Sequence, residues 1–451
     1  MPLEIVQTLS DLVALPSVNP MGREVSGREF FEHQVTDYLQ KLFERLRVPY
    51  LRQPVAPWRD NIVARLDGDR SAESGGTLVM LEAHQDTVPV TGMTIDPWKP
   101  IVRDGRLYGR GACDIKGGMA AMLVAFSRLV EERPRGMPTV LMVCTVNEEF
   151  GFSGAKALPL LWQAGKQTSP LFPQRRPEDT RGSGVGGTGT AAIKPPHPNS
   201  LPPSGGKRET IEFLPRKPDL AIVAEPTELN VVVAHKGVVR WRCHAIGRAA
   251  HSSQPQLGDS ALFRMARVLE ALEIYQHDVV ENLGNHPLCG RPTLSVGTIS
   301  GGISVNTVPD HCTIEIDRRC LPGEDPRAAW RHVLDYLRDC LGADPLVQHD
   351  EPFSESQGLN ETHNGPLAEQ LQRIVRHVSG RCEIVGVPYG TNAANIAEAG
   401  VPTVVFGPGS IAQAHTSDEW VEIEQLTLAS EAYYQLARQA GERLALQPAV
   451  E

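Results

Sequence analysis

The hydrophobic positions along the chain form two kinds of pattern, short unbroken apolar runs and longer segments with apolar residues at helical spacing. An unbroken run bounded by turn residues is typical of a parallel strand that is covered on both faces. Because runs and helical segments alternate, the pattern predicts an α/β fold with a mostly parallel sheet. Strands are predicted at residues 61–66, 77–83, 139–146, 219–224 and 403–406, and helices at residues 30–47, 119–132, 366–379 and 423–444.

The pattern changes between residues 237 and 350, where apolar and polar positions alternate along a half-exposed strand at residues 238–246. Strands and helices follow in the order β-α-β-β-α-β, which predicts a small α+β, ferredoxin-like domain. We therefore expect a discontinuous larger domain that comprises residues 1–236 and 351–451, with residues 237–350 inserted into it.

A second insertion is marked by its composition. Residues 165–218 are rich in glycine, proline, serine and threonine. Such a segment buries too little apolar surface to offset the entropy lost on ordering. We predict a disordered surface insertion within the larger domain, and we assign no chemistry to it.

Composition and charge narrow the classes of function. The 451 residues carry a formal net charge of -10, which disfavours a polyanionic partner such as nucleic acid. The eight cysteines include no CxxC pair, so we expect neither a disulfide framework nor a thiolate zinc site, and a reduced, cytoplasmic location. The N-terminus has the pattern of an amphipathic helix rather than of a signal peptide. No uncharged run is long enough to span a bilayer, so we expect no membrane partner.

Side chains with the chemistry of metal ligands follow the predicted strands. His84 and Asp86 end one strand. Glu148 and Glu149 follow another, and Glu225 follows a third. The carboxyl ends of parallel strands meet at one edge of a sheet, so these groups are expected to lie together. Adjacent carboxylates repel one another and lose hydration when enclosed, which favours a compensating cation. The simpler interpretation of the two adjacent acids is a solvated loop in which both face water.

Two further candidates come from loops. Asp114 lies in a glycine-punctuated loop at residues 106–118, and His415 follows the last predicted strand. The loop contains neither GKS/T nor a GxGxxG at a strand-to-helix turn, so a nucleotide-binding loop is disfavoured. Two histidines with several carboxylates and no thiolates form the ligand set of a two-metal hydrolytic site. A histidine satisfied by structural hydrogen bonds is the alternative interpretation for His84.

Six stretches of sequence, in the order HQDTVP, GRGACDIKGG, NEEFGFSG, AEPT, AAHSS and AHTSDE, resemble the M20 metallopeptidase family. Within it the chain is similar to the branch of acetylornithine deacetylase and succinyl-diaminopimelate desuccinylase, over nearly the whole chain except the insertion. The resemblance implies that residues 1–236 and 351–451 form a zinc-peptidase-like catalytic, metal-binding domain, that residues 237–350 form an inserted dimerisation or lid domain, and that the protein is a homodimer. It also implies two Zn2+ ions, with Co2+ or Mn2+ as substitutes, and a small N-acyl amino acid substrate.

The resemblance assigns a role to each acid and histidine of the site. Asp86 matches the carboxylate that orients the first histidine, and Glu148 matches the general base that takes a proton from water. The sequence alone leaves open an exchange of roles between Glu148 and its neighbour. The positions that match the metal ligands are His84, Asp114, Glu149, Glu225 and His415, with Asp114 as the bridging carboxylate.

Substrate contacts are implied in the inserted domain and in a late loop. His251 matches a histidine that reaches across the dimer to stabilise an oxyanion, and a histidine in a polar surface turn is the structural alternative. Asn306 and Arg319 match positions that hold the substrate carboxylate. Arg318 competes with Arg319, because only one of two consecutive strand residues faces the site. The late loop contributes Gly390, Thr391 and Asn392.

One departure from the family pattern falls in that late loop. The family commonly has an aspartate at the position of Asn392 and an arginine at that of Ala394, so the substrate pocket has less charge here. The leading hypothesis is a dizinc amidohydrolase that removes an N-acyl group from an amino acid, as acetylornithine deacetylase does in arginine biosynthesis. The alternatives are a succinyl-diaminopimelate desuccinylase or a dipeptidase of the same family and, from another class, a non-catalytic metal-binding scaffold.

Overall fold

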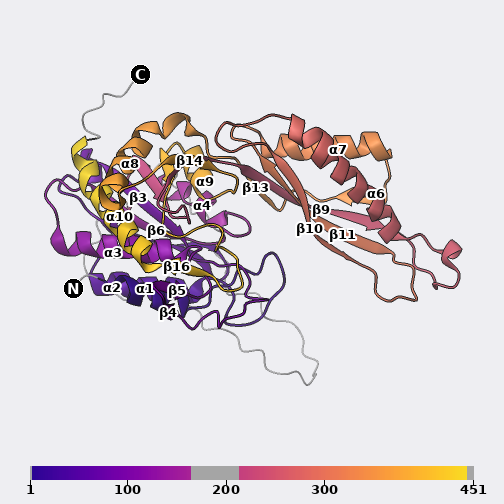
Figure 1. The fold of residues 1–451 in the computed structure, drawn as a ribbon, viewed down its shortest axis with the longest axis horizontal. Helices are drawn as coiled ribbons and strands as arrows, with labels where there is room; N and C mark the ends of the chain where they lie inside the picture. The colour runs from indigo at the N-terminus through magenta and orange to yellow at the C-terminus, as the bar shows by residue number, and fades with distance from the viewer. Residues whose placement is uncertain (1–2, 164–212, 444–451) are drawn as a thin grey trace, which may run out of the picture.

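The computed structural model describes residues 3–163 and 213–443, which form two bodies (Figure 1). The larger body is built on an eight-stranded sheet with the strand order β1-β2-β6-β3-β7-β15-β8-β14. The central strands β6, β3, β7 and β15 are parallel, whereas β2 pairs antiparallel with both β1 and β6. The sheet is therefore mixed, and the predicted parallel arrangement holds at its centre. The strands are β1 (Tyr50–Ala56), β2 (Arg59–Leu66), β3 (Leu78–His84), β6 (Thr139–Thr145), β7 (Leu220–Val223), β8 (Val231–His235), β14 (Ile384–Val387) and β15 (Thr403–Val405).

Helices cover both faces of this sheet, and the alternation of side chains along each strand supplies two separate cores. Along β3, Val79 and Leu81 pack into the core on one face, whereas Leu78 and Met80 pack into the core on the other. Every residue of β3 and β6 is buried, which explains their long apolar runs. The first core is shared with α1 (Ile5–Val13), α2 (His33–Leu46), α3 (Lys116–Glu132), α8 (Gly365–Ser379) and α10 (Ile423–Arg443), and the second with α5 (Pro159–Gln163) and α9 (Ala393–Glu398). The short helix α4 (Ser153–Ala157) precedes α5.

A small three-stranded sheet joins distant parts of the larger body. It has the order β16-β5-β4, formed by Trp420–Glu422, Arg106–Tyr108 and Ile101–Arg103. All its pairs are antiparallel. The sheet therefore holds the segment just before β16 against the loop that follows β5.

The second body contains a separate antiparallel sheet with the order β10-β11-β9-β12, and β13 also pairs with β9. The helices α6 and α7 pack around Trp241, Ile314 and Val333, and in Figure 1 the body extends away from the larger one. Because β13 lies beyond residue 350, the small sheet continues past the predicted boundary. The division into domains stays a prediction. The elements are β9 (Gly237–Ile246), α6 (Ala261–Ile274), β10 (Thr293–Gly301), β11 (His311–Cys320), α7 (Pro326–Leu341), β12 (Val347–His349) and β13 (Ser354–Ser356).

The predicted disordered insertion falls mainly on residues 164–212, which lie outside the described part of the chain. Residues 213–218 are packed: Leu214 is 2% exposed within the second core, and Arg216 pairs with Asp219 at 2.7 Å. The packed chain thus resumes earlier than the predicted boundary. Among the described residues, none of the helices is both long enough and apolar enough to cross a membrane.

Candidate active site

His84 is the last residue of β3, so the strand delivers its imidazole to the carboxyl edge of the sheet. Its Nδ1 lies 3.0 Å from the backbone oxygen of Asp86, and its Nε2 lies 3.1 Å from Asp114 Oδ1. A carbonyl oxygen only accepts hydrogen bonds, so Nδ1 carries the proton. Nε2, which faces Asp114, is then the ring nitrogen that would bind a metal.

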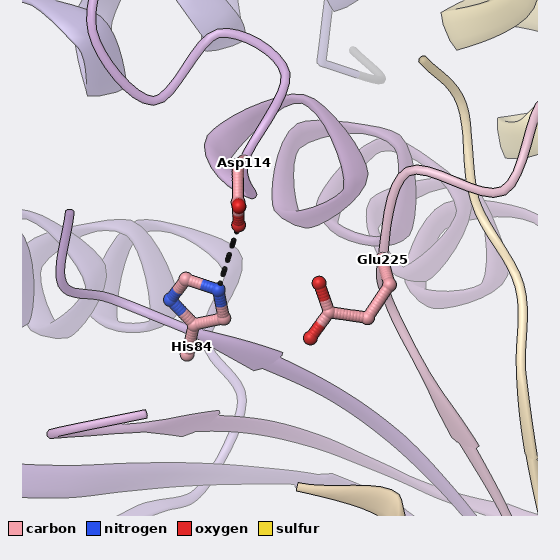
Figure 2. A group of neighbouring side chains, drawn as sticks. All are labelled: His84, Asp114 and Glu225. Atoms are coloured by element: carbon pink, nitrogen blue, oxygen red, sulfur yellow. Dashed lines mark hydrogen bonds and ion pairs between the residues drawn. The ribbon is translucent and has the colours of Figure 1, made fainter. Parts of the chain in front are cut away.

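Asp114 is shared by two groups of donor atoms. Its Oδ1 faces His84, and its Oδ2 lies 3.2 Å from His415 Nε2. The donor atoms of His84, Asp114 and Glu225 lie within 4.8 Å of one another, and so do those of Asp114, Glu149 and His415. Figure 2 shows the first group, whose side chains come from three different elements and point toward a common space. The structure thus brings together the five residues that the resemblance assigns as ligands.

Each donor group contains a buried carboxylate oxygen without a partner in the described structure. These atoms are Glu225 Oε1 in the first group and Glu149 Oε1 in the second. Burial, and after it the charges of Glu148 and Asp114, raise the pKa of Glu225 well above its usual range. A divalent cation supplies the positive charge that such carboxylates lack. Nitrogen and oxygen donors, no thiolate and one unpartnered oxygen in each group therefore fit a site for two metal ions.

Glu148 lies beside the donor groups but belongs to neither. It follows β6 and is 8% exposed. Burial raises the pKa of its carboxyl well above the usual range; the charges of Glu149 and Asp114 add to this effect, and His84 opposes it. A carboxylate with raised proton affinity beside metal ligands is suited to take a proton from water.

Asp86 holds the turn that carries the two adjacent acids. Its Oδ1 accepts the backbone N–H of Glu148 at 3.1 Å, and its Oδ2 accepts that of Glu149 at 3.2 Å. Asn19 Nδ2 also donates to Oδ2 at 2.7 Å. Burial alone raises the pKa of Asp86, but the hydrogen bond and charge of His84 outweigh it and lower the pKa to about 2. This carboxylate thus holds the acidic pair, and its Oδ1 lies 3.5 Å from His84 Nδ1, so its predicted role in orienting that histidine stays a prediction.

Glu32 stabilises the same turn from the other side. Its Oε1 accepts the backbone N–H of Asn147 at 3.0 Å and pairs with Arg59 Nη1 at 2.6 Å. Arg59 also donates to Asn19 Oδ1 at 3.3 Å, which joins this pair to Asp86. Asn147 has a φ of 62°, a left-handed conformation that asparagine tolerates better than most residues. The N–H groups of residues 147–149 are therefore each held by a buried carboxylate.

A further buried acid, absent from the predicted site, holds the loop of Asp114. Oε1 of Glu419 accepts the backbone N–H groups of Cys113 and Asp114, each at 2.9 Å. Its Oε2 accepts the N–H of Gly111 at 3.1 Å and pairs with Arg110 Nη1 at 2.6 Å. Glu419 comes directly before β16, so the small sheet brings it there. Its only signal in the sequence is its place at the end of the AHTSDE stretch.

The late loop lies against buried polar groups of the larger body. Thr391 Oγ1 is 3.1 Å from His235 Nε2. Asn392 Nδ2 donates to Glu82 Oε1 and to Thr145 Oγ1, each at 3.0 Å. Burial raises the pKa of Glu82 to about 7, and the amide of Asn392 gives it a donor that an aspartate lacks. The side chain of Asn392 is occupied inside the protein, and its role toward substrate stays a prediction.

His251 and Asn306 lie together on the exposed surface of the second body. The backbone N–H of Ser252 donates to Asn306 O at 2.9 Å, and His251 Nδ1 lies 2.8 Å from Ser253 Oγ. Neither residue belongs to a donor group of this chain. The predicted reach of His251 across a dimer and the predicted contact of Asn306 with the substrate carboxylate both stay predictions.

The two consecutive arginines lie on opposite faces of β11. Arg318 is fully buried and pairs with Glu324 at 2.8 Å. Arg319 donates to Asp317 Oδ1 at 2.7 Å and lies beside Gly390, where an added Cβ would be 4.0 Å from Arg319 Nη1. Strand alternation thus places Arg319 toward the late loop, while its contact with substrate stays a prediction.

Histidine and carboxylate donors gathered around one aspartate at the edge of an α/β sheet define a class, the metal-dependent hydrolases. Residues 80–439 match the peptidase family M20/M25/M40. An acetylornithine deacetylase of Myxococcus xanthus is 31% identical over 371 residues, which cover 81% of this chain and 80% of that protein. The chain therefore belongs to the peptidase family M20/M25/M40, and it is a hydrolytic enzyme.

Other similar proteins carry different names. A probable carboxypeptidase of Emericella nidulans is 29% identical over 449 residues, which cover 96% of this chain and 89% of that protein. Among solved structures, an M20 family metallo-carboxypeptidase from Sulfolobus solfataricus has a TM-score of 0.69 at 16% identity, over 97% of this chain and 99% of that chain. The structural likeness shows that the fold is shared, and the family's members differ in substrate.

Proposed function

We propose that the protein is a dizinc amidohydrolase that removes an N-acyl group from an amino acid. The observation that carries the proposal is the carboxylate of Asp114, whose two oxygens lie 3.1 Å from His84 Nε2 and 3.2 Å from His415 Nε2. A carboxylate that presents one oxygen to each donor group is suited to bridge two ions. Nitrogen and oxygen donors without thiolates support zinc, with Co2+ or Mn2+ as substitutes.

Each residue around the donor groups has its own role in the proposed reaction. Two divalent ions held by these donors would supply Lewis acidity to an amide carbonyl and would acidify water. Glu148 takes the proton from the water that attacks the amide carbon and returns it to the departing amine. Asp86 keeps Glu148 in place, since it accepts the backbone N–H of that residue.

The relatives support an amide next to a carboxylate as the substrate. The Myxococcus xanthus relative is named for acetylornithine, which is an N-acyl amino acid. The Emericella nidulans relative favours a second candidate, a peptide cleaved beside its C-terminal carboxylate. Arg319 offers a planar guanidinium that suits the carboxylate of either compound. A role in arginine biosynthesis follows if acetylornithine is the substrate.

We also propose a cytoplasmic homodimer. Apolar side chains are exposed near His251 on the second body, with Phe263 75%, Ile303 86% and Val305 100% exposed. Apolar side chains that gather on a water-facing surface favour a protein interface. A second subunit seated there would bring its own His251 toward the first subunit's site. The eight cysteines are all free, which supports a reduced compartment.

The test is release of free amine from N-acetyl amino acids, N-succinyl amino acids and dipeptides. Purified protein is assayed with added zinc, with a chelator, and after zinc is restored. We expect zinc-dependent release from an N-acyl amino acid and none with the chelator. Silence across the whole panel from protein that holds two metal ions would contradict the proposed function.

A further inference from the structure

Glu82, Thr145 and Asn392 are three buried polar side chains that hydrogen bonds join in a closed triangle. The hydroxyl of Thr145 donates to Glu82 Oε1, and Asn392 Nδ2 donates to Glu82 Oε1 and to Thr145 Oγ1, each at 3.0 Å. No side chain of the three is more than 1% exposed. Glu82 Oε2 has no partner in the described structure, so the carboxylate depends on the other two side chains for its hydrogen bonds.

The triangle joins the strand ends that carry the site to the late loop. Glu82 lies two residues before His84 on β3, so both side chains project from the same face of that strand. Thr145 is the last residue of β6, where it pairs with His84, and the acidic pair follows soon after it. Asn392 comes directly before α9. A displaced loop would therefore lose hydrogen bonds to both strands.

The residue before Asn392 is bonded inward as well. Burial lowers the pKa of His235 to about 4, so its ring is neutral at pH 7, and Nδ1 carries the proton because it lies 2.9 Å from Lys236 O. The hydroxyl of Thr391 therefore donates to Nε2 at 3.1 Å, and its oxygen accepts the N–H of Ala393 at 3.1 Å. Two consecutive side chains thus fix the loop from within the protein.

The amide at position 392 is matched to the carboxylate at position 82. The two N–H bonds of the Asn392 amide point to Glu82 and Thr145, and an aspartate would have neither. A second carboxylate at that position would lie against the first, and two buried carboxylates in contact repel one another unless they share a proton. The asparagine that departs from the family pattern therefore has a structural partner in Glu82.

We propose that Glu82 and Asn392 are a positioning pair, which holds the late loop where its backbone at Gly390 meets the substrate. The pair touches neither substrate nor ion and acts through the loop. At Gly390 an added Cβ would lie 4.0 Å from Arg319 Nη1, so a displaced loop would change the surface beside that guanidinium. The contact between loop and substrate rests on the proposed function.

Exchange of the acid and the amide tests the positioning role. Asn392→Asp should raise KM for an N-acyl amino acid about 10–100-fold by misplacing the loop. Because Asn392 belongs to neither donor group, kcat and zinc content should change little. Glu82→Gln combined with Asn392→Asp puts an amide and a carboxylate back in contact, and should return KM to within about threefold of the unaltered value.

Asn395→Asp is the matched control for this exchange. It makes the same change on α9, where Asn395 Nδ2 donates to the hydroxyl of Ser356 at 3.2 Å rather than to a carboxylate. A hydroxyl can donate to a carboxylate in turn, so this variant should leave KM unchanged. No recovery of KM in the double variant, or an equal rise in Asn395→Asp, would overturn the proposal.

Amide hydrogen exchange in metal-free protein needs neither ion nor turnover, so it separates the pair from the proposed function. The N–H of Ala393 donates to Thr391 Oγ1, and that of Ile396 donates to Asn392 O. We expect Asn392→Asp to speed exchange in a peptide of residues 388–397 about tenfold or more, and the double variant to restore the slower rate.

The exchange experiment also covers a variant that does not fold. If Asn392→Asp is unfolded, the combination with Glu82→Gln should fold, because it restores the contact between amide and carboxylate. Unfolding of both variants would refute the pair. Unchanged exchange in folded Asn392→Asp would refute it too, even if the enzyme cleaves N-acyl amino acids.

Discussion

The carboxylate of Glu419 accepts the backbone N–H of Asp114 at 2.9 Å, although the two residues are 305 positions apart in the sequence. The same carboxylate accepts the N–H groups of Gly111 and Cys113 and pairs with Arg110. Glu419 therefore shapes the turn that presents the shared carboxylate to both donor groups. The position of the Asp114 carboxylate therefore depends on Glu419, whose hydrogen bonds go to backbone N–H groups and to Arg110.

Glu419→Gln should destabilise the protein and loosen its metal ions. Glutamine offers one acceptor oxygen, turns its NH2 toward other donors, and leaves Arg110 buried without its charge partner. Breaking a buried pair predicts a loss of about 3–5 kcal/mol in the free energy of unfolding and about 10–100-fold weaker metal binding. Urea denaturation and competition with a chelator measure the two effects. Glu422→Gln removes a half-exposed acid nearby and serves as the control. Equal behaviour of the two variants would contradict this account.

Asp86→Asn should lower the activity of the enzyme or its affinity for zinc. The two oxygens of Asp86 accept the N–H groups of Glu148 and Glu149 and contact His84. The single side-chain oxygen of an asparagine can keep only part of these contacts. Loss of such an outer contact predicts about 10–100-fold lower activity or metal affinity. Activity at saturating zinc and a zinc titration distinguish the two. An enzyme with unaltered activity and unaltered zinc affinity would show that Asp86 orients nothing essential.

Glu148→Gln should abolish most turnover while metal binding persists. Loss of a general base predicts a fall in kcat of about 100- to 10,000-fold. The neighbouring variant Glu149→Gln is the matched control, because Glu149 belongs to a donor group and its loss should reduce metal content. Elemental analysis measures the metal content of both variants, and amine release measures their turnover. Together they show which of the two acids is the general base and which is the metal ligand. The reverse result would exchange their roles, an outcome that the sequence alone left open.

His235 makes stability depend on pH. Burial lowers its pKa from 6.5 to about 4, so the unfolded chain binds the proton more readily than the folded chain between these values. The stability that this residue contributes is complete above pH 6.5 and is lost as the pH falls toward 4, by about 2 kcal/mol between pH 7.5 and pH 5. His235→Gln removes this titration. The unfolding free energy of the unaltered protein should therefore fall further over this interval than that of the variant, and parallel curves would contradict the assignment.

The sequence predicts those strands whose apolar pattern matches the burial of their side chains in the fold. The strands β3 and β6 are buried at every residue, so their apolar runs identify them without knowledge of their partners. β8 was not predicted, although its five residues are also buried. It pairs with β14 and β15, more than 140 residues later in the chain. Pairing over such a distance leaves no periodicity in the sequence.

The same distinction applies to the site. The metal-ligand candidates could be predicted because their side chains have the required chemistry and either follow predicted strands or, as with Asp114, lie in a glycine-punctuated loop. Glu32 and Glu419 could not, because they act by accepting backbone N–H groups of distant loops. Asn392 was placed in the substrate pocket by resemblance, whereas the structure shows its amide bonded to Glu82 and Thr145. A side chain's neighbours across the fold, rather than its type, determine such roles.

Metal stoichiometry tests the central claim, that Asp114 is shared by two ion sites. Equilibrium dialysis against zinc, followed by elemental analysis, counts the ions bound by each variant. We expect two ions in the unaltered protein, one in Glu225→Gln, one in His415→Ala and none in Asp114→Ala, because each of the first two changes removes a donor from one group only. Retention of a tightly bound ion by folded Asp114→Ala, or loss of both ions in His415→Ala and Glu225→Gln alike, would contradict the shared site.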